Sequence, residues 1–296
     1  METEVGELDA FLDQGVKAAC SGTKRVGVVF SGGIDSVLAA KKAEEFCDAA
    51  CYTVGFPDSA DFRFARIAAD ELGLELNEVK LDSEALEEAL TSVLKLVGEP
   101  NPLAVGVGVP MYLSSKAASE DGLSIMLCGQ GADELFGGYW RYVDAYVKRG
   151  PQAVLDWMSR DVDSADIDNL NRDRLVTSAN GVELRFPYLL PELRDYALDL
   201  PLEWRVREVD SGLSGYECVD EFSGRVFVRK YVLREVAAKN GLPKEIINRP
   251  KKAAQYGSLV HKNMDRLARK KGYKKKARDL GEKSHLKLYL RHLLHS

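Results

Sequence analysis

The stretch SGGIDS at residues 31–36 sets two glycines among side chains that could bind phosphate. It follows the apolar run RVGVVF (25–30) and precedes a segment with helical spacing. Gly32 and Gly33 lack a Cβ atom, so their backbone N–H groups can approach an anion closely. The helix that follows would point the positive end of its dipole at the same place. This pattern is typical of an anion site.

The side chains of the turn indicate that a cation would bind together with the anion. Ser31 and Ser36 supply hydroxyl donors, whereas the carboxylate of Asp35 would repel an anion unless a cation came with it. A magnesium-bound polyphosphate suits all three side chains. An ordinary strand-to-helix turn capped by Asp or Ser explains the local pattern equally well. Neither a Gly-Lys-Ser/Thr sequence nor GxGxxG spacing is present, so the turn is not a Walker or a dinucleotide motif.

Alternating strands and helices would position this turn. Apolar runs predict strands at 25–30, 51–56, 74–82 and 123–129, and helical spacing predicts helices at 5–20, 35–47, 60–72, 83–97 and 111–122. A loop rich in Pro and Gly is expected at 99–110. The alternation predicts an α/β fold, with a parallel sheet and helices on both faces.

The pattern changes after about residue 138, where buried strand runs end and helical or irregular segments follow. Within this region, Gly-Ser turns between apolar–polar alternations predict a β-hairpin insertion near 203–229. We therefore expect three parts: an α/β core at 1–137, a mostly helical part at 138–260, and a basic helical tail at 261–296.

Charge and composition narrow the class of protein. Residues 249–296 hold 15 Lys and Arg against 3 Asp and Glu. Such a block is usually a solvated helix or tail, and the alternatives are contact with RNA or attraction of polyanionic ligands. No apolar run approaches 18 residues and no secretory leader is visible, so we expect a cytoplasmic protein without membrane contact. Five cysteines without a CxxC pair and four histidines without metal-ligand spacing indicate reduced thiols and no zinc site.

The turn resembles the pyrophosphate loop SGGxDS of the N-type ATP pyrophosphatases. Those enzymes cleave ATP between the α- and β-phosphates, transfer AMP to a substrate oxygen and hold pyrophosphate in this loop. A second stretch, LCGQGADELFGGYWRY (127–142), is similar to GEGADELFGGY of the asparagine synthetase C-terminal domain. Four more segments match that family in the same order: PMYLSSKAA (110–118), GVELRFPYL (181–189), KYVLREVAAKNGLP (230–243) and RPKKAAQYGS (249–258). The resemblance implies the family's PP-loop fold, similar to adenine nucleotide alpha hydrolases, with a parallel sheet of the five-stranded type.

The same resemblance implies a nucleotide site. It assigns Mg²⁺ binding to Asp35 and Asp133, and ATP or pyrophosphate binding to Phe30, Ser31, Gly32, Gly33, Asp35, Ser36, Val54, Gly55, Gly129 and Lys251. Asp133 also follows a glycine-rich turn at the end of a predicted parallel strand, where open α/β sheets bind ligands; a helix cap is its alternative. The backbone of Val54 and Gly55 would hold adenine, unless these residues simply end a buried strand.

The implied catalytic residues are Lys251, Glu183 and Gln130. Lys251 would reach the α-phosphate and the acyl-adenylate, with Lys252 as the alternative in register and an ordinary tail lysine as the other alternative. In the related β-lactam synthetases, a Glu in the region of Glu183 helps to move a proton; a buried structural ion pair with Arg185 is equally compatible with the sequence. Lys230 and Arg234 share a helix face that would meet either the phosphates or solvent.

Three departures from the family pattern bear on the substrate. Gln130 stands where asparagine synthetases have Glu and β-lactam synthetases have Tyr, and a neutral amide can hydrogen-bond but cannot act as a general base. Residues 103–109 (LAVGVGV) replace a loop that offers Thr and Arg to the substrate carboxylate. Glu2 stands where the glutaminase nucleophile would be Cys, and the sequence before residue 25 has no room for a glutaminase domain. Leu190 also replaces the usual Asp after the PFL segment.

The sequence thus predicts a ligase that uses ATP and Mg²⁺ to adenylate a small-molecule carboxylate and then forms an amide with ammonia or an amine. Asparagine formation from aspartate is the default version, with ammonia from solution or from a separate glutaminase subunit. The alternatives are an ATP pyrophosphatase that modifies tRNA, which the basic tail favours, and a non-catalytic nucleotide-binding partner of a glutaminase. A homodimer is the oligomeric state that we consider for this protein.

Overall fold

A five-stranded parallel sheet forms the centre of the molecule, which is described from a computed structural model covering residues 2–165, 169–210 and 215–296. The strands lie in the order β3-β2-β1-β4-β5, and every neighbouring pair is parallel. Their bounds are β1 (Arg25–Val29), β2 (Asp48–Gly55), β3 (Glu75–Lys80), β4 (Ile125–Leu127) and β5 (Glu183–Arg185). All five carboxyl ends therefore meet at one edge of the sheet, and the predicted α/β fold with a parallel sheet is confirmed.

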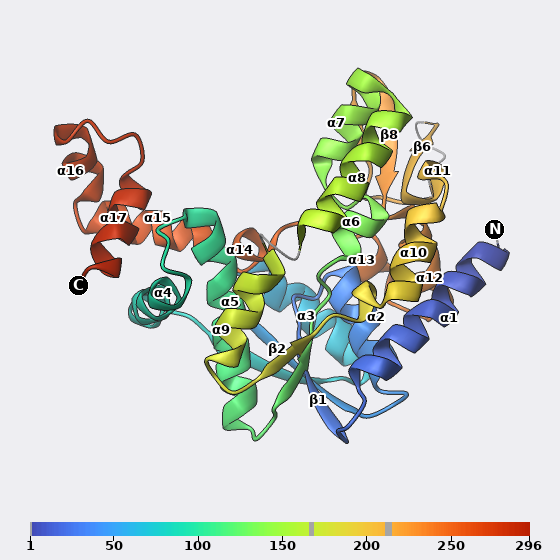
Figure 1. Cartoon of the computed structure of the whole chain (residues 1–296), viewed down its shortest axis with the longest axis horizontal. Coiled ribbons are helices and arrows are strands. Elements are labelled where there is room, and N and C mark those ends of the chain that lie inside the picture. The colour runs from blue at the N-terminus through green and yellow to red at the C-terminus, as the bar shows by residue number, and fades with distance from the viewer. Residues whose placement is uncertain (1, 166–168, 211–214) are drawn as a thin grey trace.

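Helices cover both faces of the sheet (Figure 1). One face carries α1 (Glu2–Ala19), α2 (Ile34–Ala43), α3 (Ala60–Leu72), α12 (Tyr231–Lys239) and α13 (Lys244–Ile247). The other face carries α4 (Ser83–Val97), α5 (Pro102–Glu120), α9 (Asn171–Ser178), α15 (Val260–Lys270) and α17 (His285–Leu294). Alternate residues of the strands point into the two cores, which is why strands such as β2 are buried almost throughout.

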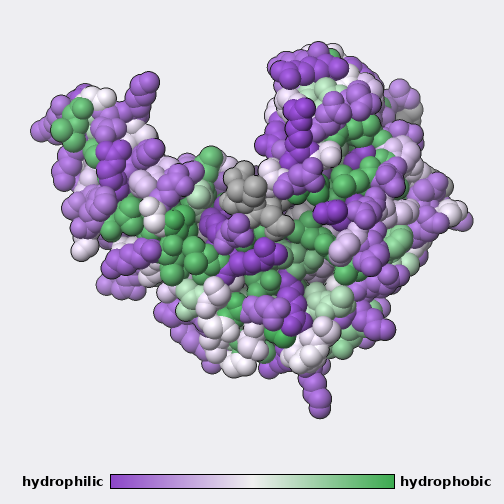
Figure 2. All heavy atoms as spheres, in the orientation of Figure 1, coloured by the Kyte–Doolittle hydropathy of each residue, from purple (hydrophilic) through white to green (hydrophobic). Residues whose placement is uncertain are grey.

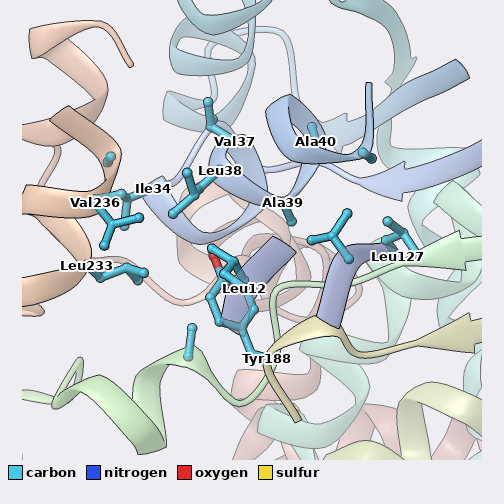
Figure 3. Close-up of a cluster of buried hydrophobic side chains, with 14 of the residues drawn as sticks. Leu12, Ile34, Val37, Leu38, Ala39, Ala40, Leu127, Tyr188, Leu233 and Val236 are labelled. Atoms are coloured by element: carbon cyan, nitrogen blue, oxygen red, sulfur yellow. The ribbon is translucent and has the colours of Figure 1, made fainter. Parts of the chain in front are cut away.

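The first of these cores lies directly beneath the SGGIDS turn (Figure 3). Leu12 of α1, Leu38 of α2 and Leu233 of α12 meet there, each with no exposed surface. Tyr188, in the short 3-10 helix η2 (Pro187–Leu189), is also fully buried and closes this core. The turn between β1 and α2 is therefore supported by segments that are distant in the sequence.

The stretch 99–110, expected to be a loop, is largely helical, because α5 begins at Pro102. The side chain of Asn101 caps this helix by accepting hydrogen bonds from the backbone N–H groups of Leu103 and Ala104. Close packing explains the glycines: a Cβ on Gly108 would lie 2.8 Å from a methyl carbon of Val93 on α4. Tertiary packing thus outweighs the low helix propensity of this segment.

The boundary expected at residue 137 does not separate the sheet from the rest of the chain. Strand β5, which sequence patterns did not reveal, comes from beyond that boundary and pairs with β4. In the segment where a β-hairpin was expected, β7 (Asp220–Phe222) and β8 (Arg225–Arg229) form one, and β6 (Val206–Val209) pairs with β8. This small sheet packs on the helices α7 (Trp140–Arg149), α8 (Pro151–Ala165) and α11 (Leu202–Arg205) around a third core.

The remaining elements join these layers to a basic arm. Short helices connect them: α6 (Ala132–Phe136), α10 (Pro191–Asp199) and α14 (Ala254–Gly257). The arm consists of α15, α16 (Tyr273–Asp279) and α17, folded against α4 and α5. Figure 2 shows a broad hollow between this arm and the part formed by α7, α8 and β8. No helix among the described residues is long and apolar enough to cross a membrane.

Candidate active site

The SGGIDS turn is preformed and tightly packed. Gly32 adopts φ 69°, and a Cβ there would lie 2.4 Å from the backbone nitrogen of Ala65 on α3, so only glycine fits. The hydroxyl of Ser36 donates to the carbonyl of Gly33 at 3.1 Å, and the hydroxyl of Ser31 accepts from the N–H of Gly33 at 3.3 Å. The turn therefore holds its shape through its own hydrogen bonds.

Two distant segments fix this turn in place. The buried hydroxyl of Tyr188 donates to the carbonyl of Asp35 at 3.0 Å. Arg249, only 5% exposed in its side chain, donates to the carbonyl of Ser31 and forms an ion pair with the buried carboxylate of Asp61. A charge-assisted pair of this kind, taken out of water, holds its geometry firmly. The segments RFPYL and RPKK are thus tied to the turn.

The two carboxylates implied by the motifs meet at Lys230. The ammonium nitrogen of Lys230 lies 2.6 Å from Asp35 Oδ2 and 2.7 Å from Asp133 Oδ1. Lys251 forms an ion pair with the other oxygen of Asp133. Lys230 is 1% exposed and adopts φ 55°, a left-handed conformation that residues other than glycine rarely adopt. The surrounding ion pairs hold this lysine in its unusual position.

Electrostatic interactions in this cluster favour the charged forms of Asp133 and Lys251. Burial opposes ionisation of Asp133, but the ammonium groups of Lys230 and Lys251 outweigh it and hold the pKa of Asp133 well below its usual range. Burial likewise opposes the charge on Lys251, yet Asp133 and Asp35 raise the pKa of its ammonium group. The neighbouring Glu134 differs, because burial and the charge of Asp133 raise its pKa.

The carboxylates fit a magnesium ion that arrives with phosphate. Asp133 Oδ1 is buried and accepts no hydrogen bond, although Lys230 lies near it as a counter-ion. Within the described ranges, no three His, Cys, Asp or Glu side chains cluster to hold a metal by themselves. Mg²⁺ usually takes one or two carboxylates and completes its coordination with water and phosphate oxygens. Asp35 and Asp133 supply that kind of partial site.

A small cavity of about 40 Å³ opens beside the turn. One carboxylate lines it, that of Asp35, against five cationic side chains: Lys230, Arg234, Arg249, Lys251 and Lys252. Ser31, Gly33 and Ile34 complete the wall on the side of the turn. So dense a concentration of positive charge at a glycine turn suits a compact polyanion.

A larger cavity of about 480 Å³ adjoins the small one. Ser31, Asp35, Lys251 and Lys252 line both cavities and form the junction between them. The wall of the large cavity comes from the end of β4 with Gly129 and Gln130, and from helices α5 and α9. The arrangement offers a long substrate one anionic end site and one roomier, mixed site.

Comparison with known proteins shows the family of the chain. A family model described as asparagine synthase matches residues 7–166 and 151–294. The chain belongs to the asparagine synthase family. A Methanocaldococcus jannaschii protein named as a putative glutamine-hydrolyzing asparagine synthetase 1 is 39% identical over 289 residues, which cover 91% of this chain and 52% of that protein. The human glutamine-hydrolyzing asparagine synthetase is 32% identical over 272 residues, covering 89% of this chain and 45% of the human protein.

The chain therefore spans about half the length of the curated relatives that it matches. Among solved structures, the NMN synthetase from Francisella tularensis aligns over 98% of this chain and 92% of its own, with 14% identity and a TM-score of 0.46.

The structure leaves some residues implied by the asparagine synthase resemblance outside both cavities. Glu183 lies at the start of β5, opposite the start of β4, so it sits at the amino end of the sheet and away from the turn. Its carboxylate is 61% exposed and pairs with Arg185 at 2.8 Å. This position away from the turn does not favour the catalytic role expected for Glu183, and the ion-pair alternative describes its contact, although the pair is not buried.

Three further residues contribute less than expected. Val54 and Gly55 end β2 but line neither cavity, because the segment after α14 covers this strand end and the carbonyl of Ser258 accepts from the N–H of Phe56. The side chain of Phe30 is buried in the core, so only its backbone reaches the turn. For Val54 and Gly55 the sequence allows either a contact with adenine or an ordinary strand end. The structure favours the ordinary strand end.

Several residues of the site escaped sequence patterns. Arg172 and Asp173 lie on α9, in a stretch expected to be helical or irregular, and Arg172 lines the large cavity. Tyr139 also lines it and donates to the buried carboxylate of Glu134 at 2.5 Å. Tyr139 stands within the matched segment 127–142, which was the available signal for it, whereas neither residue type nor spacing marks Arg172 and Asp173 as part of a buried polar network.

Proposed function

We propose that this member of the asparagine synthase family binds Mg-ATP, transfers AMP to a carboxylate and forms an amide with ammonia or an amine. One observation carries the proposal. The small cationic cavity and the larger mixed cavity share a junction at Ser31, Asp35 and Lys251. ATP laid across that junction would have its β- and γ-phosphates in the cationic cavity and its α-phosphate between the two.

The chemistry follows from that placement. An oxygen of the substrate carboxylate attacks the α-phosphorus from the large cavity, the bond to the β-phosphate bridging oxygen breaks, and pyrophosphate remains in the small cavity. Lys251, at the junction, stabilises the charge that builds on the α-phosphate. Ammonia or an amine then attacks the acyl carbon, gives up a proton, and AMP leaves. The products are an amide, AMP and pyrophosphate.

The remaining residues bind and orient. Magnesium held by Asp35 and Asp133 would neutralise charge on the pyrophosphate side when it is bound. Lys230, released from the two carboxylates, would pair with phosphate oxygens. Arg249 and Asp61 keep the turn from moving as charge is transferred across it. Such preorganised donors cost little reorganisation during the reaction.

The substrates are proposed at the level of class. Asparagine formation from aspartate is the default version within the asparagine synthase family. The nitrogen would come as ammonia from solution or from a separate glutaminase subunit. A homodimer remains the oligomer to test.

One observation favours a second candidate, modification of RNA by adenylation. Helix α16 of the arm carries Lys274, Lys275 and Lys276, all exposed and without a carboxylate partner among the residues that the structure describes. Cations that no carboxylate neutralises attract the phosphate backbone of nucleic acid.

Pyrophosphate release from ATP tests the proposal. The protein is incubated with Mg²⁺, ammonium and ATP, and a panel of amino acids and other small carboxylic acids is added singly. We expect one acid to stimulate release, with AMP formed in equal amount. Stimulation by tRNA instead would favour the second candidate. ATP binding without turnover under any of these conditions would contradict both enzymatic proposals.

A further inference from the structure

We propose that Asp173 is a positioning residue that decides which polar groups of Gln130 and Arg172 face the large cavity. This inference rests on the proposed function, because it treats that cavity as the substrate site. Asp173 lies on α9, has no exposed surface and does not itself line the cavity. Gln130 and Arg172, which do line it, both donate hydrogen bonds to this carboxylate.

The contact with Asp173 fixes the amide of Gln130. Gln130 Nε2 lies 2.8 Å from Asp173 Oδ2. An ionised carboxylate only accepts hydrogen bonds, so the NH₂ group must face it and the carbonyl oxygen must point elsewhere. At position 130 the cavity is therefore offered a neutral acceptor in a single orientation.

The same carboxylate holds the guanidinium of Arg172. Arg172 Nε and Nη2 each lie 2.8 Å from Asp173 Oδ1, and Nη1 donates to Asn169 Oδ1 at 3.2 Å. A guanidinium has five N–H groups, so one remains on each terminal nitrogen for a group in the cavity. Asp173 thus places an acceptor and a pair of donors on one wall.

This network accounts for the amide at position 130. The asparagine synthetase motif that this segment resembles has a glutamate there, and a glutamate would put a second carboxylate within hydrogen-bond distance of Asp173. Two like charges at that distance in a buried site cannot both ionise at low cost. In this chain the carboxylate lies on α9, behind the surface of the wall, and the group at the surface is neutral.

The test uses three variants: Gln130→Glu, Asp173→Asn and the two changes combined. Gln130→Glu alone should lower Tm by about 5 °C at neutral pH, because it sets a second carboxylate against the buried carboxylate of Asp173. The double variant should regain most of that loss, since an amide then faces a carboxylate again. Asp195→Asn, an exposed carboxylate on α10 next to its partner Arg194, serves as the matched control and should leave Tm unchanged.

Kinetic measurements distinguish a positioning role of Asp173 from a role in stabilising the fold. In Asp173→Asn, pyrophosphate release should fall at least tenfold and the KM of the stimulating acid should rise, whereas the KM of ATP should stay within about twofold, because Asp173 does not touch the turn. Equal losses for ATP and acid, or unchanged kinetics with a lower Tm, would overturn the positioning role.

The Tm cycle needs no turnover, so it stands even if no acid stimulates the wild-type protein. The inference depends on the contact between Gln130 and Asp173. If the Gln130→Glu variant were as stable as the wild type, the double variant would have no loss to recover, and that contact would be overturned. Failure of the proposed function would appear instead as absent pyrophosphate release from a wild-type protein that still shows the expected Tm cycle.

Discussion

The two adjoining cavities are built in different ways. The small one is lined by residues of the SGGIDS turn and by five cationic side chains that include Lys230, Arg249 and Lys251. The large one is made of side chains from helices α5 and α9 and from the end of β4. The first can serve any triphosphate, because phosphates are alike. Under the proposed function the second cavity would differ between substrates, and its residues would set the specificity.

The largest expected effect concerns the junction of the cavities. Lys251→Ala should lower turnover by about 10³-fold, because it removes a donor aimed at the charge developing on the α-phosphate. ATP affinity should change by about threefold at most, which isothermal titration measures. Lys252→Ala is the matched comparison and should lose much less turnover. Both lysines line the junction, so equal losses in both variants would show that Lys251 has no special role there.

Asp35→Ala should abolish magnesium-dependent ATP binding. The change removes one of the two carboxylates that fit the metal and leaves Lys230 paired with Asp133 alone. Titration with ATP in the presence and absence of Mg²⁺ checks this prediction. Unchanged affinity with Mg²⁺ would remove Asp35 from the phosphate end of the site.

Gly32→Ala should lower the free energy of unfolding by about 3 kcal/mol, because the new methyl group meets the backbone of α3 at a positive φ. Gly22 also has a positive φ, but nothing lies within 4 Å of the position that a Cβ would take there, so Gly22→Ala should cost about 1 kcal/mol. Denaturant unfolding of both variants measures the difference. Equal costs would show that the turn is not held by close packing.

The glycine turn belongs to the part of the structure that the sequence could predict. Gly32, Asp35 and Lys251 stand in short motifs whose residue types follow directly from phosphate chemistry, and the parallel sheet follows from alternating apolar runs. Strand β5 has only three residues, and the helical start of α5 contains glycines, so neither gives a clear periodic signal.

The wall of the large cavity was beyond prediction for a physical reason. Asp173 and Gln130 are 43 positions apart and meet only in the folded chain, where α9 packs on α5 near Gly108. A pattern within one segment cannot show such a contact. Glu183 was misplaced for the converse reason, since its motif is local but its strand delivers the side chain to the far end of the sheet.

The cluster at Asp133 should also respond to acid. The pKa of Asp133 is lowered in the folded protein, so its carboxylate contributes stability above the unfolded value near pH 4 and loses it as the pH falls further toward the folded value. Asp133→Asn should thus lower Tm by about 5 °C at neutral pH and by less in acid. A Tm difference that stays constant with pH would contradict the ion-pair network.

The smallest effect should come from the arm. Reversing three charges together, Lys274→Glu, Lys275→Glu and Lys276→Glu, should leave pyrophosphate release with a small acid within about twofold, because surface charges distant from the site act only through screened fields. The same variant should lose RNA affinity in a filter-binding assay if the second candidate function holds. A tenfold fall in turnover with the small acid would instead place the arm in the ligase reaction.

The most direct test of the adenylation step traces an oxygen atom of the substrate carboxylate into the products. The acid that best stimulates pyrophosphate release is labelled with ¹⁸O in its carboxylate and turned over with Mg-ATP and ammonium, and the phosphorus products are examined by ³¹P NMR. Adenylation predicts one ¹⁸O atom in AMP and none in pyrophosphate. Formation of ADP and phosphate, or AMP that carries no label, would contradict the account.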